Sequence, residues 1–320
     1  MKRLFLFIVF SFFANIFSDV SSRSYFSTTP LFRPTMPEMV TVMHDKVEEE
    51  YPRNKIDVVF LGSVSGSADD ITKYFLPNCK TEIVAAGLGA ESAKSETADV
   101  LANYFNVLTA PELTSASDDT INNLYSSYTF ESRLTFKPTQ KMFGTAIRYK
   151  RHLSDFTDKG WWVEVTFPIV VVKNDLGMKE EIIKKGGSGG SSPVVPTGFV
   201  GNMTDAFKQT TWRYGKIDGA KKKAGVADIY LRLGTDYVKE PTHHLATFMG
   251  VIIPTGNKPD GEFIFEPVVG NGGHLGLYFG ASAGFRIWSE SNKSIYWRLD
   301  TSGSVLAENT QNRSFDLKGK

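Results

Sequence analysis

The chain contains a single cysteine, Cys79, among its 320 residues. A lone cysteine cannot form an intramolecular disulfide, which excludes the small secreted proteins whose folds depend on such bonds. Neither sign of charge is in excess, because 36 lysine and arginine residues stand against 35 aspartate and glutamate residues. The composition therefore gives no indication of a nucleic-acid partner. Charged residues make up 22% of the chain, close to the globular average, so extensive disorder is not expected.

Long apolar segments are also missing. Beyond the N-terminus, the most apolar stretch is Val165–Val172, which Pro168 interrupts. It is much shorter than the roughly 20 residues that a helix needs to cross a bilayer. The sequence therefore does not predict a helical membrane protein.

The N-terminus has the layout of a secretory signal peptide. Basic residues at 1–3 precede an apolar run over 4–14, with small residues further on. We expect residues 1–22 to be this peptide, because cleavage after Ser22 fits better than cleavage after Ser18. The alternative is a buried N-terminal strand or a membrane anchor. An exported, cysteine-poor chain without a helical span is either soluble outside the cytoplasm or a membrane β-barrel.

What the chain does contain is 13% aromatic residues and 28 glycines. Residues 23–119 form an N-terminal lead with short apolar segments suited to strands at 56–64 and 80–87. Apolar residues at three- and four-residue spacing predict one short helix over Ser92–Asn106. The pairs Asp69-Asp70 and Asp118-Asp119 are interpreted as helix caps or turns.

Within residues 120–320 the pattern changes to alternation of apolar and polar residues, which is typical of strands with one polar face. The segment 245–253 differs, because it is nearly apolar on both faces. The predicted strands lie within residues 130–136, 143–150, 161–172, 227–237, 245–253, 275–287 and 295–307. Between them, 174–224 is predicted to be a long polar loop that contains a flexible Gly- and Ser-rich run at 186–192.

The length of these strands favours a membrane protein. Leu275–Ile287 and Ile295–Ala307 exceed the five or six residues of an average strand and match the 9–11 or so of a transmembrane strand. Tryptophan and tyrosine near strand ends suit a membrane interface. We therefore expect an all-β fold, an antiparallel transmembrane β-barrel with one short N-terminal helix. The chain ends just as a new strand begins at Phe315, so we expect either a barrel truncated at its C-terminus or one that closes differently.

One part of the chain carries a family resemblance. A G-x-x-D strand, Gly225–Leu233, is followed by a strand that ends in Pro254-Thr255-Gly256 and then by a glycine-rich segment. Over residues 225–288 this layout resembles the bacterial outer-membrane proteins of the meta-pathway phenol-degradation family. The resemblance implies a channel for small, often aromatic or apolar compounds in the outer membrane of a Gram-negative bacterium.

No catalytic, cofactor-binding or metal site is expected. Adjacent residues of a strand point to opposite faces, so His243-His244 makes a poor metal-binding pair. The segment Gly62–Gly66 lacks the spacing of a nucleophile elbow. Lys221-Lys222-Lys223 is interpreted as a solvated loop or, alternatively, as a contact to phosphates of lipopolysaccharide.

The residues most suited to a function are charged residues on the polar faces of the predicted strands. They are Asp228, Arg232, Asp236, Arg286, Arg298 and Asp300. They either line a lumen, where charges of both signs tune which solutes pass, or pair with one another across strands. We therefore expect a porin-like outer-membrane channel without covalent chemistry, with lipid, lipopolysaccharide and a small solute as partners. The alternatives are a structural or host-contact protein that displays 174–224, and a soluble secreted β-sandwich that binds a ligand.

Overall fold

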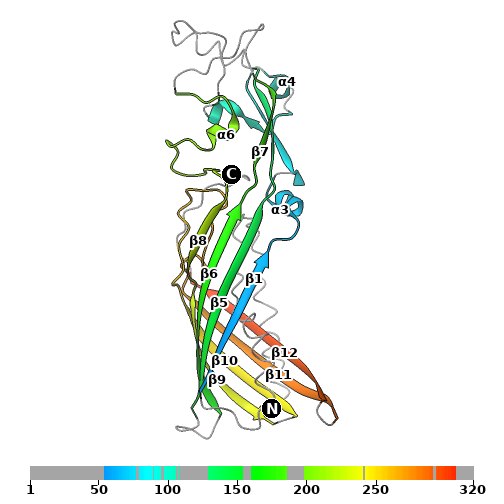
Figure 1. Ribbon diagram of the computed structural model, residues 1–320, viewed down its shortest axis with the longest axis vertical. Coiled ribbons are helices and arrows are strands. Elements are labelled where there is room, and N and C mark those ends of the chain that lie inside the picture. Colours follow the sequence, from blue (N-terminus) through cyan, green and yellow to red (C-terminus); the bar gives the residue numbers. More distant parts are fainter. Residues whose placement is uncertain are drawn as a thin grey trace.

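The computed structural model describes residues 54–76, 79–88, 90–94, 97–105, 107, 129–153, 160–185, 198–240, 242–290 and 293–307. The expected signal peptide at 1–22 and the pair Asp118-Asp119 lie outside these residues. The described chain is mostly antiparallel β and forms one large and one small sheet (Figure 1). Among the residues that the structure describes, no helix has the length and apolar character needed to cross a membrane.

Seven strands follow one another across the large sheet, and all neighbours in this path are antiparallel. In spatial order they are β1 (Asn54–Val64), β5 (Thr139–His152), β6 (Trp161–Asp175), β9 (Ile229–Lys239), β10 (His243–Ile253), β11 (Gly276–Glu290) and β12 (Lys293–Leu306). An eighth strand, β8 (Lys221–Val226), pairs with the upper part of β6. The alternation of apolar and polar residues thus predicted these long strands correctly.

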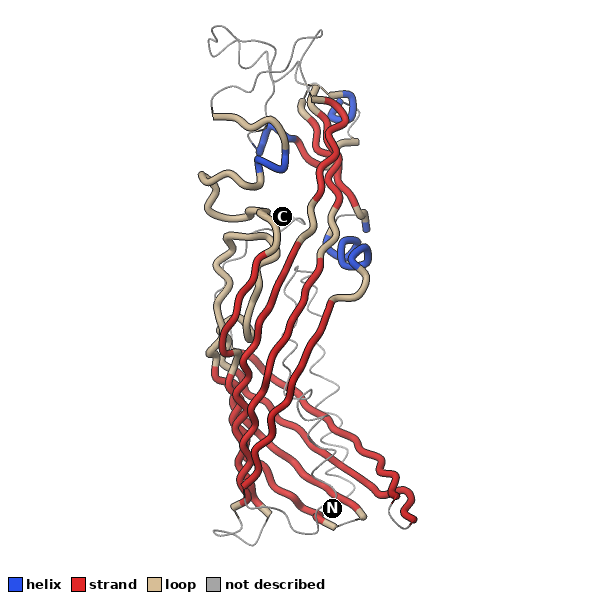
Figure 2. Tube along the Cα trace, in the orientation of Figure 1, coloured by secondary structure: helices blue, strands red, loops and turns tan. Residues whose placement is uncertain are grey.

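The large sheet is strongly curled (Figure 2). Trp162 on β6 and Phe248 on β10 are separated by one intervening strand, yet their ring centroids are 6.5 Å apart. Tyr230 and Tyr278 meet in the same way, at 5.6 Å. Side chains converge like this only on a concave face, which we call the inner face. Within the described residues β1 and β12 stay unpaired with each other, so the sheet is an open half-barrel and the expected closed barrel is not formed there.

The small sheet has the order β3–β2–β4–β7. Its strands are β3 (Val100–Leu101), β2 (Glu82–Ala86), β4 (Glu131–Thr135) and β7 (Lys179–Lys184). The two sheets share a continuous ribbon, because β4 leads into β5 and β6 leads into β7 without a change of register. At the junction the amide of Lys137 donates to the carbonyl of Leu176 (3.1 Å). Gly177 has a positive φ of 59°, which glycine adopts without strain.

The segment 174–224 is more structured than a polar loop. It contains β7, the short helix α6 (Met203–Ala206) and β8. Its residues Met203, Phe207 and Ile217 join a buried cluster with Phe130 and Leu134 beside the small sheet. The apolar residues that form this core are scattered along the segment, so no local hydrophobic periodicity predicts them.

The helix predicted over Ser92–Asn106 is not formed. The described residues there belong to the one-turn helix α4 (Glu91–Lys94), to β3 and to the 3₁₀-helix η2 (Ala102–Phe105). The amide of Asp99 donates to the carbonyl of Val84 (2.9 Å), and the amide of Val84 donates to the Asp99 carboxylate (3.0 Å). These long-range bonds pull the segment alongside β2. The longest described helix is instead α3 (Ala68–Phe75), which the side chain of Ser67 caps.

Candidate functional site

The two faces of the large sheet have opposite characters. Charged and polar side chains are buried on the inner face, whereas large apolar side chains are exposed on the outer face. The buried polar group includes Gln140, Arg148, His152, Glu164, Thr166, Asn174, Asp228, Arg232, Asp236 and Ser282. The exposed apolar group includes Ile56, Val58, Phe60, Phe143, Ile147, Ile169, Leu231, Leu233, Met249, Leu277, Phe285, Ile287, Ile295, Trp297, Leu299 and Val305. A soluble protein has the reverse arrangement, so this inversion marks the candidate site.

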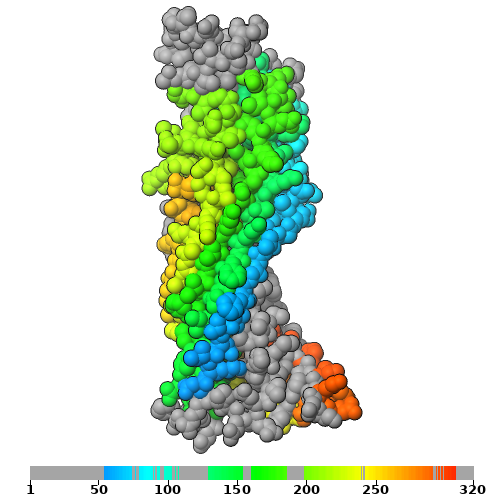
Figure 3. All heavy atoms as spheres, viewed as in Figure 1, coloured from blue at the N-terminus to red at the C-terminus, as the bar shows by residue number. Residues whose placement is uncertain are grey.

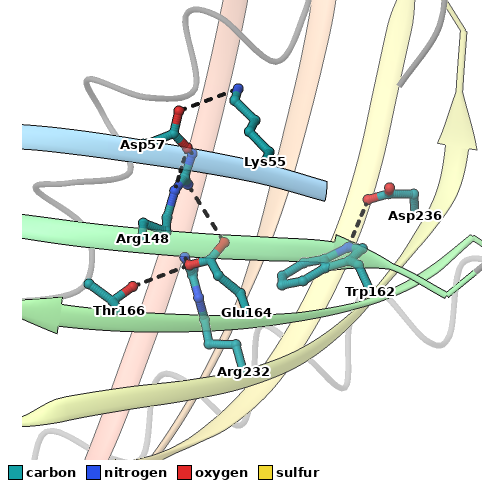
Figure 4. Close-up of polar contacts among 8 residues, drawn as sticks. All are labelled: Lys55, Asp57, Arg148, Trp162, Glu164, Thr166, Arg232 and Asp236. Atoms are coloured by element: carbon teal, nitrogen blue, oxygen red, sulfur yellow. Dashed lines mark hydrogen bonds and ion pairs between the residues drawn. The ribbon is translucent and has the colours of Figure 1, made fainter. Parts of the chain in front are cut away.

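Four charged residues form a row across the inner face, one from each of four adjacent strands (Figure 4). Asp57 lies opposite Arg148 in the register of β1 and β5, and Glu164 lies opposite Arg232 in the register of β6 and β9. We call these four residues the charge row. The signs of the charges alternate along the charge row. Arg148 therefore lies between two carboxylates, and Glu164 lies between two guanidinium groups.

The geometry of the charge row is that of a continuous ion-pair network. Arg148 donates to Asp57 Oδ2 from Nη2 (2.5 Å) and from Nε (3.0 Å), and its Nη1 lies 3.7 Å from Glu164 Oε2. Arg232 donates from Nη2 to Glu164 Oε1, which also accepts from the Thr166 hydroxyl (3.4 Å). The side chains of Arg148, Glu164 and Arg232 are only 3%, 2% and 5% exposed. Charges buried this deeply are tolerated because each has a partner.

A tryptophan connects the charge row to the lower end of the sheet. The indole Nε1 of Trp162 donates to Asp236 Oδ1 (3.1 Å), which also lies 3.4 Å from Nε2 of His244. The ammonium of Lys150 lies 4.4 Å from the centre of the Trp162 ring, and the Arg232 guanidinium lies 4.9 Å from that of Phe248. These cation–π contacts fix the charged side chains against the aromatic ones.

Asp228 has a different surrounding from Arg232 and Asp236. Across Ala227–Asp228 the partner on β6 shifts by one residue, so a β-bulge separates β8 from β9. The Asp228 carboxylate accepts from the amide of Asn271 (2.7 Å), and amides of the Pro254-Thr255-Gly256 turn also bond to it. The Thr255 hydroxyl donates to the carbonyl of Ala227. The G-x-x-D strand and the Pro254-Thr255-Gly256 turn are therefore in contact, and hydrogen bonds to Asp228 hold the turn in place.

The remaining predicted residues lie further along the same face. Asp300 on β12 is opposite Ser282, which follows in register from Ala246 and Asp236. Arg286 lies on the inner face of β11, where its amide donates to the carbonyl of Thr242 (2.7 Å). Arg298 on β12 is opposite Gly284 on β11, and the side chain of Arg298 lies outside the described part of the structure. The register thus places Arg232, Asp236, Arg286 and Asp300 on one face, and only Arg232 and Asp236 belong to the network around the charge row.

Three members of the charge row were not predicted from the sequence: Asp57, Arg148 and Glu164. Each occupies a polar position in an alternating strand, and that alternation was the available indication. What the sequence does not give is the strand order, which places β1, β5, β6 and β9 side by side. Without that order, no residue on β1 or β5 could be assigned a partner.

The histidines that the structure describes do not belong to a cluster suited to a metal ion. His243 and His244 begin β10 and contact different acids, Glu240 and Asp236 respectively. In the described chain, no group of three or more His, Cys, Asp or Glu residues is arranged to hold a metal ion.

No protein-family model, no curated protein and no solved structure matches the chain. The resemblance to the meta-pathway phenol-degradation family therefore stays a prediction.

Proposed function

We propose that the chain is exported through its N-terminal segment and forms the wall of a β-barrel in the outer membrane of a Gram-negative bacterium. In this proposal the barrel is a porin-like channel that lets small solutes pass without covalent chemistry. One observation carries it. The large sheet exposes apolar side chains on its convex face and buries an ion-pair network on its concave face.

The outer face suits a lipid environment. All seven strands of the path have 11–15 residues, enough to cross the apolar part of a bilayer at a tilt. Strands β1, β5 and β6 form an unbroken wall in the space-filling view (Figure 3). At the lower end, Tyr237, Trp288 and Trp297 are exposed. Aromatic residues with a polar group are favoured at this depth, where the apolar ring meets lipid and the polar atom meets water.

The inner face suits a polar path. Transmembrane barrels alternate lipid-facing apolar residues with lumen-facing polar ones. Strands β6 and β9 do so around Glu164 and Arg232, whereas the inner side of β10 is apolar at Phe248 and Ile252. Closure of the seven antiparallel strands into a barrel without a parallel pair requires an even number of strands. The proposal therefore includes at least one further strand between β12 and β1.

Single-channel recording from the refolded full chain in planar bilayers tests this function. We expect discrete conductance steps from protein that migrates as a compact species before boiling. Compact protein that never conducts would contradict the channel and favour a structural or host-contact role. Release of the native protein from membranes by carbonate washing would contradict membrane insertion and favour a soluble β-sandwich.

A matched pair of variants on β11 sharpens the test. Ser282 points to the inner face and is 8% exposed, whereas Ala283 is its neighbour on the outer face. Ser282→Trp places a large side chain in the proposed path and should lower the conductance of each step. Ala283→Trp points toward lipid and should leave the conductance unchanged. Equal conductance of both variants would contradict a path along the inner face.

A further inference from the structure

The lysine tripeptide at the start of β8 is divided between the two faces of the sheet. Lys221 and Lys223 face inward, where the Lys221 ammonium lies 2.9 Å from Asp218 Oδ2 and 4.1 Å from the centre of the Phe263 ring. Lys222 faces outward and is exposed. The tripeptide is therefore neither a loop nor one basic patch, and its middle residue belongs to the outer surface.

On that surface Lys222 continues a row of lysines. The register places Lys141 of β5 opposite Lys173 of β6, and Lys173 opposite Lys222 of β8. All three are exposed. Adjacent strands lie about 4.8 Å apart, so the backbone positions of the three lysines lie along a line of about 10 Å. We call these residues the lysine row.

Within the described residues, none of the three lysines of the lysine row forms an ion pair. Like charges directly opposite one another on neighbouring strands destabilise a sheet. Other described lysines do form ion pairs, among them Lys55, Lys73, Lys80, Lys216 and Lys221. On the same face the nearest acid along β6 is Asp175, whose Oδ1 accepts from the amide of Gly177 (2.8 Å). The arrangement is thus suited to an anion supplied from outside the chain.

The position of the lysine row identifies the kind of anion. The next outward row along the same three strands consists of Phe143, Val171 and Ala224, about 6.7 Å away. Phe143 is 61% exposed, and the row beyond it contains Ile169, which is 46% exposed. The ammonium groups therefore lie at the border of the apolar outer surface, where lysine stems can lie on apolar groups while their charges reach a polar layer.

We propose that the lysine row binds the phosphate groups of anionic lipids at the membrane surface, with the acyl chains covering the apolar rows beside it. This inference rests on the proposed insertion of the sheet in a membrane. A lipid satisfies both parts of the surface, because it offers a phosphate to the ammonium groups and hydrocarbon to Phe143 and Ile169. A free phosphate ion would satisfy only the first part.

The test compares refolding of the full chain into two kinds of vesicle, phosphatidylcholine alone and phosphatidylcholine mixed with phosphatidylglycerol. The variant K141Q/K173Q/K222Q removes the lysine row. The matched control, K179Q/K184Q/K208Q, removes three exposed lysines from β7 and from the segment after α6. The readout is the fraction of compact, protease-protected protein in each vesicle, repeated with inorganic phosphate at constant ionic strength.

We expect wild type and control to prefer the anionic vesicles, and the row variant to lose about fivefold of this preference for each lysine removed. Inorganic phosphate should leave the preference of the wild type intact. Insertion of the wild type in both vesicles without preference, or equal preference in all three proteins, would overturn the lipid-binding role of the lysine row. Either result would leave the proposed function standing. Competition by inorganic phosphate would overturn the assignment to lipid. Failure of the wild type to insert in either vesicle would overturn the proposed function and this inference together.

Discussion

Two arginines on the inner face depend on one carboxylate. Glu164 is the shared partner of Arg148 and Arg232, and its side chain is 2% exposed. Glu164→Gln keeps the shape but removes the carboxylate that lies between the two guanidinium groups. Arg232 then loses its ion pair with Glu164, while Arg148 keeps its pair with Asp57. Because breaking a buried ion pair from one side is costly, we expect a loss of about 3–5 kcal/mol in the free energy of unfolding. Urea unfolding of the refolded protein, followed by tryptophan fluorescence, measures this loss.

The double variant E164Q/R232Q provides the control for this prediction. Removing Arg232 as well removes the buried charge that lost its ion pair with Glu164, so the double variant should recover part of the stability that E164Q loses. A single variant that unfolds at the wild-type urea concentration would show that the charge row does not support the fold.

The raised pKa of Asp228 predicts how the stability of the fold depends on pH. Burial raises the pKa of Asp228, which precedes β9, to about 6, against the lowering effect of bonds from the amides of Asn271, Gly256 and Thr255. Because the folded pKa lies above the unfolded value, the protonated form stabilises the fold. That stability is complete below about pH 4 and is lost as the pH rises through about 6.

In the wild type, titration of Asp228 should lower the free energy of unfolding by up to about 3 kcal/mol as the pH rises from about 4 to above about 6. Asp228→Asn should abolish this dependence on pH. The measurement is the difference in urea midpoint between wild type and variant as a function of pH, because the other titrating groups are common to both. A difference that does not vary with pH would contradict a titrating Asp228.

At the scale of elements, prediction succeeded where the side-chain period alone decides the structure. The strands from Trp161, Ile229, Gly276 and Lys293 onward repeat every two residues because one face is apolar, so their existence follows from local sequence. The helix expected over Ser92–Asn106 failed because Asp99 bonds to Val84, a contact that no local pattern shows.

The candidate site was predictable to a smaller extent. Arg232 and Asp236 stand on the polar face of an obvious strand. Their partners Glu164 and Trp162 become partners only through the pairing of β6 with β9. A β-bulge at Asp228 also cannot be read from alternation, because one extra residue simply shifts the phase. Pairing and register arise from the whole sheet, and a single sequence does not contain them in local form.

Packing between β6 and β9 depends on a glycine. A Cβ on Gly234 would lie only 2.1 Å from a ring carbon of Trp162. Gly234→Ala should displace the indole, break its bond to Asp236 and lower the free energy of unfolding by about 1–3 kcal/mol. Gly225→Ala is the matched control, since the nearest atom to its Cβ would be a Val269 methyl at 3.8 Å.

Urea unfolding and the tryptophan emission maximum together check this prediction. The G234A protein should unfold earlier and emit at a different wavelength, while the G225A protein should resemble wild type in both. Identical behaviour of the two variants would show that Trp162 does not pack against Gly234.

At the scale of the whole molecule, positive and negative charges are nearly equal in number. The chain has 36 basic and 35 acidic residues, and the charge row has two carboxylates opposite two guanidinium groups. The unbalanced lysines lie on the outer face instead. A lumen bounded by the inner face would therefore carry a transverse field but little net charge.

Ion selectivity tests this distribution. With nearly cancelling charges on the inner face, the reversal potential in a potassium chloride gradient should lie close to zero. Lys150→Gln removes one positive charge beside Trp162 and should shift the reversal potential toward cation selectivity. Lys222→Gln removes the same charge from the outer face and should leave the reversal potential unchanged, because lipid separates that position from the lumen. A shift from K222Q as large as that from K150Q would mean that the two faces of the sheet have been assigned the wrong way round.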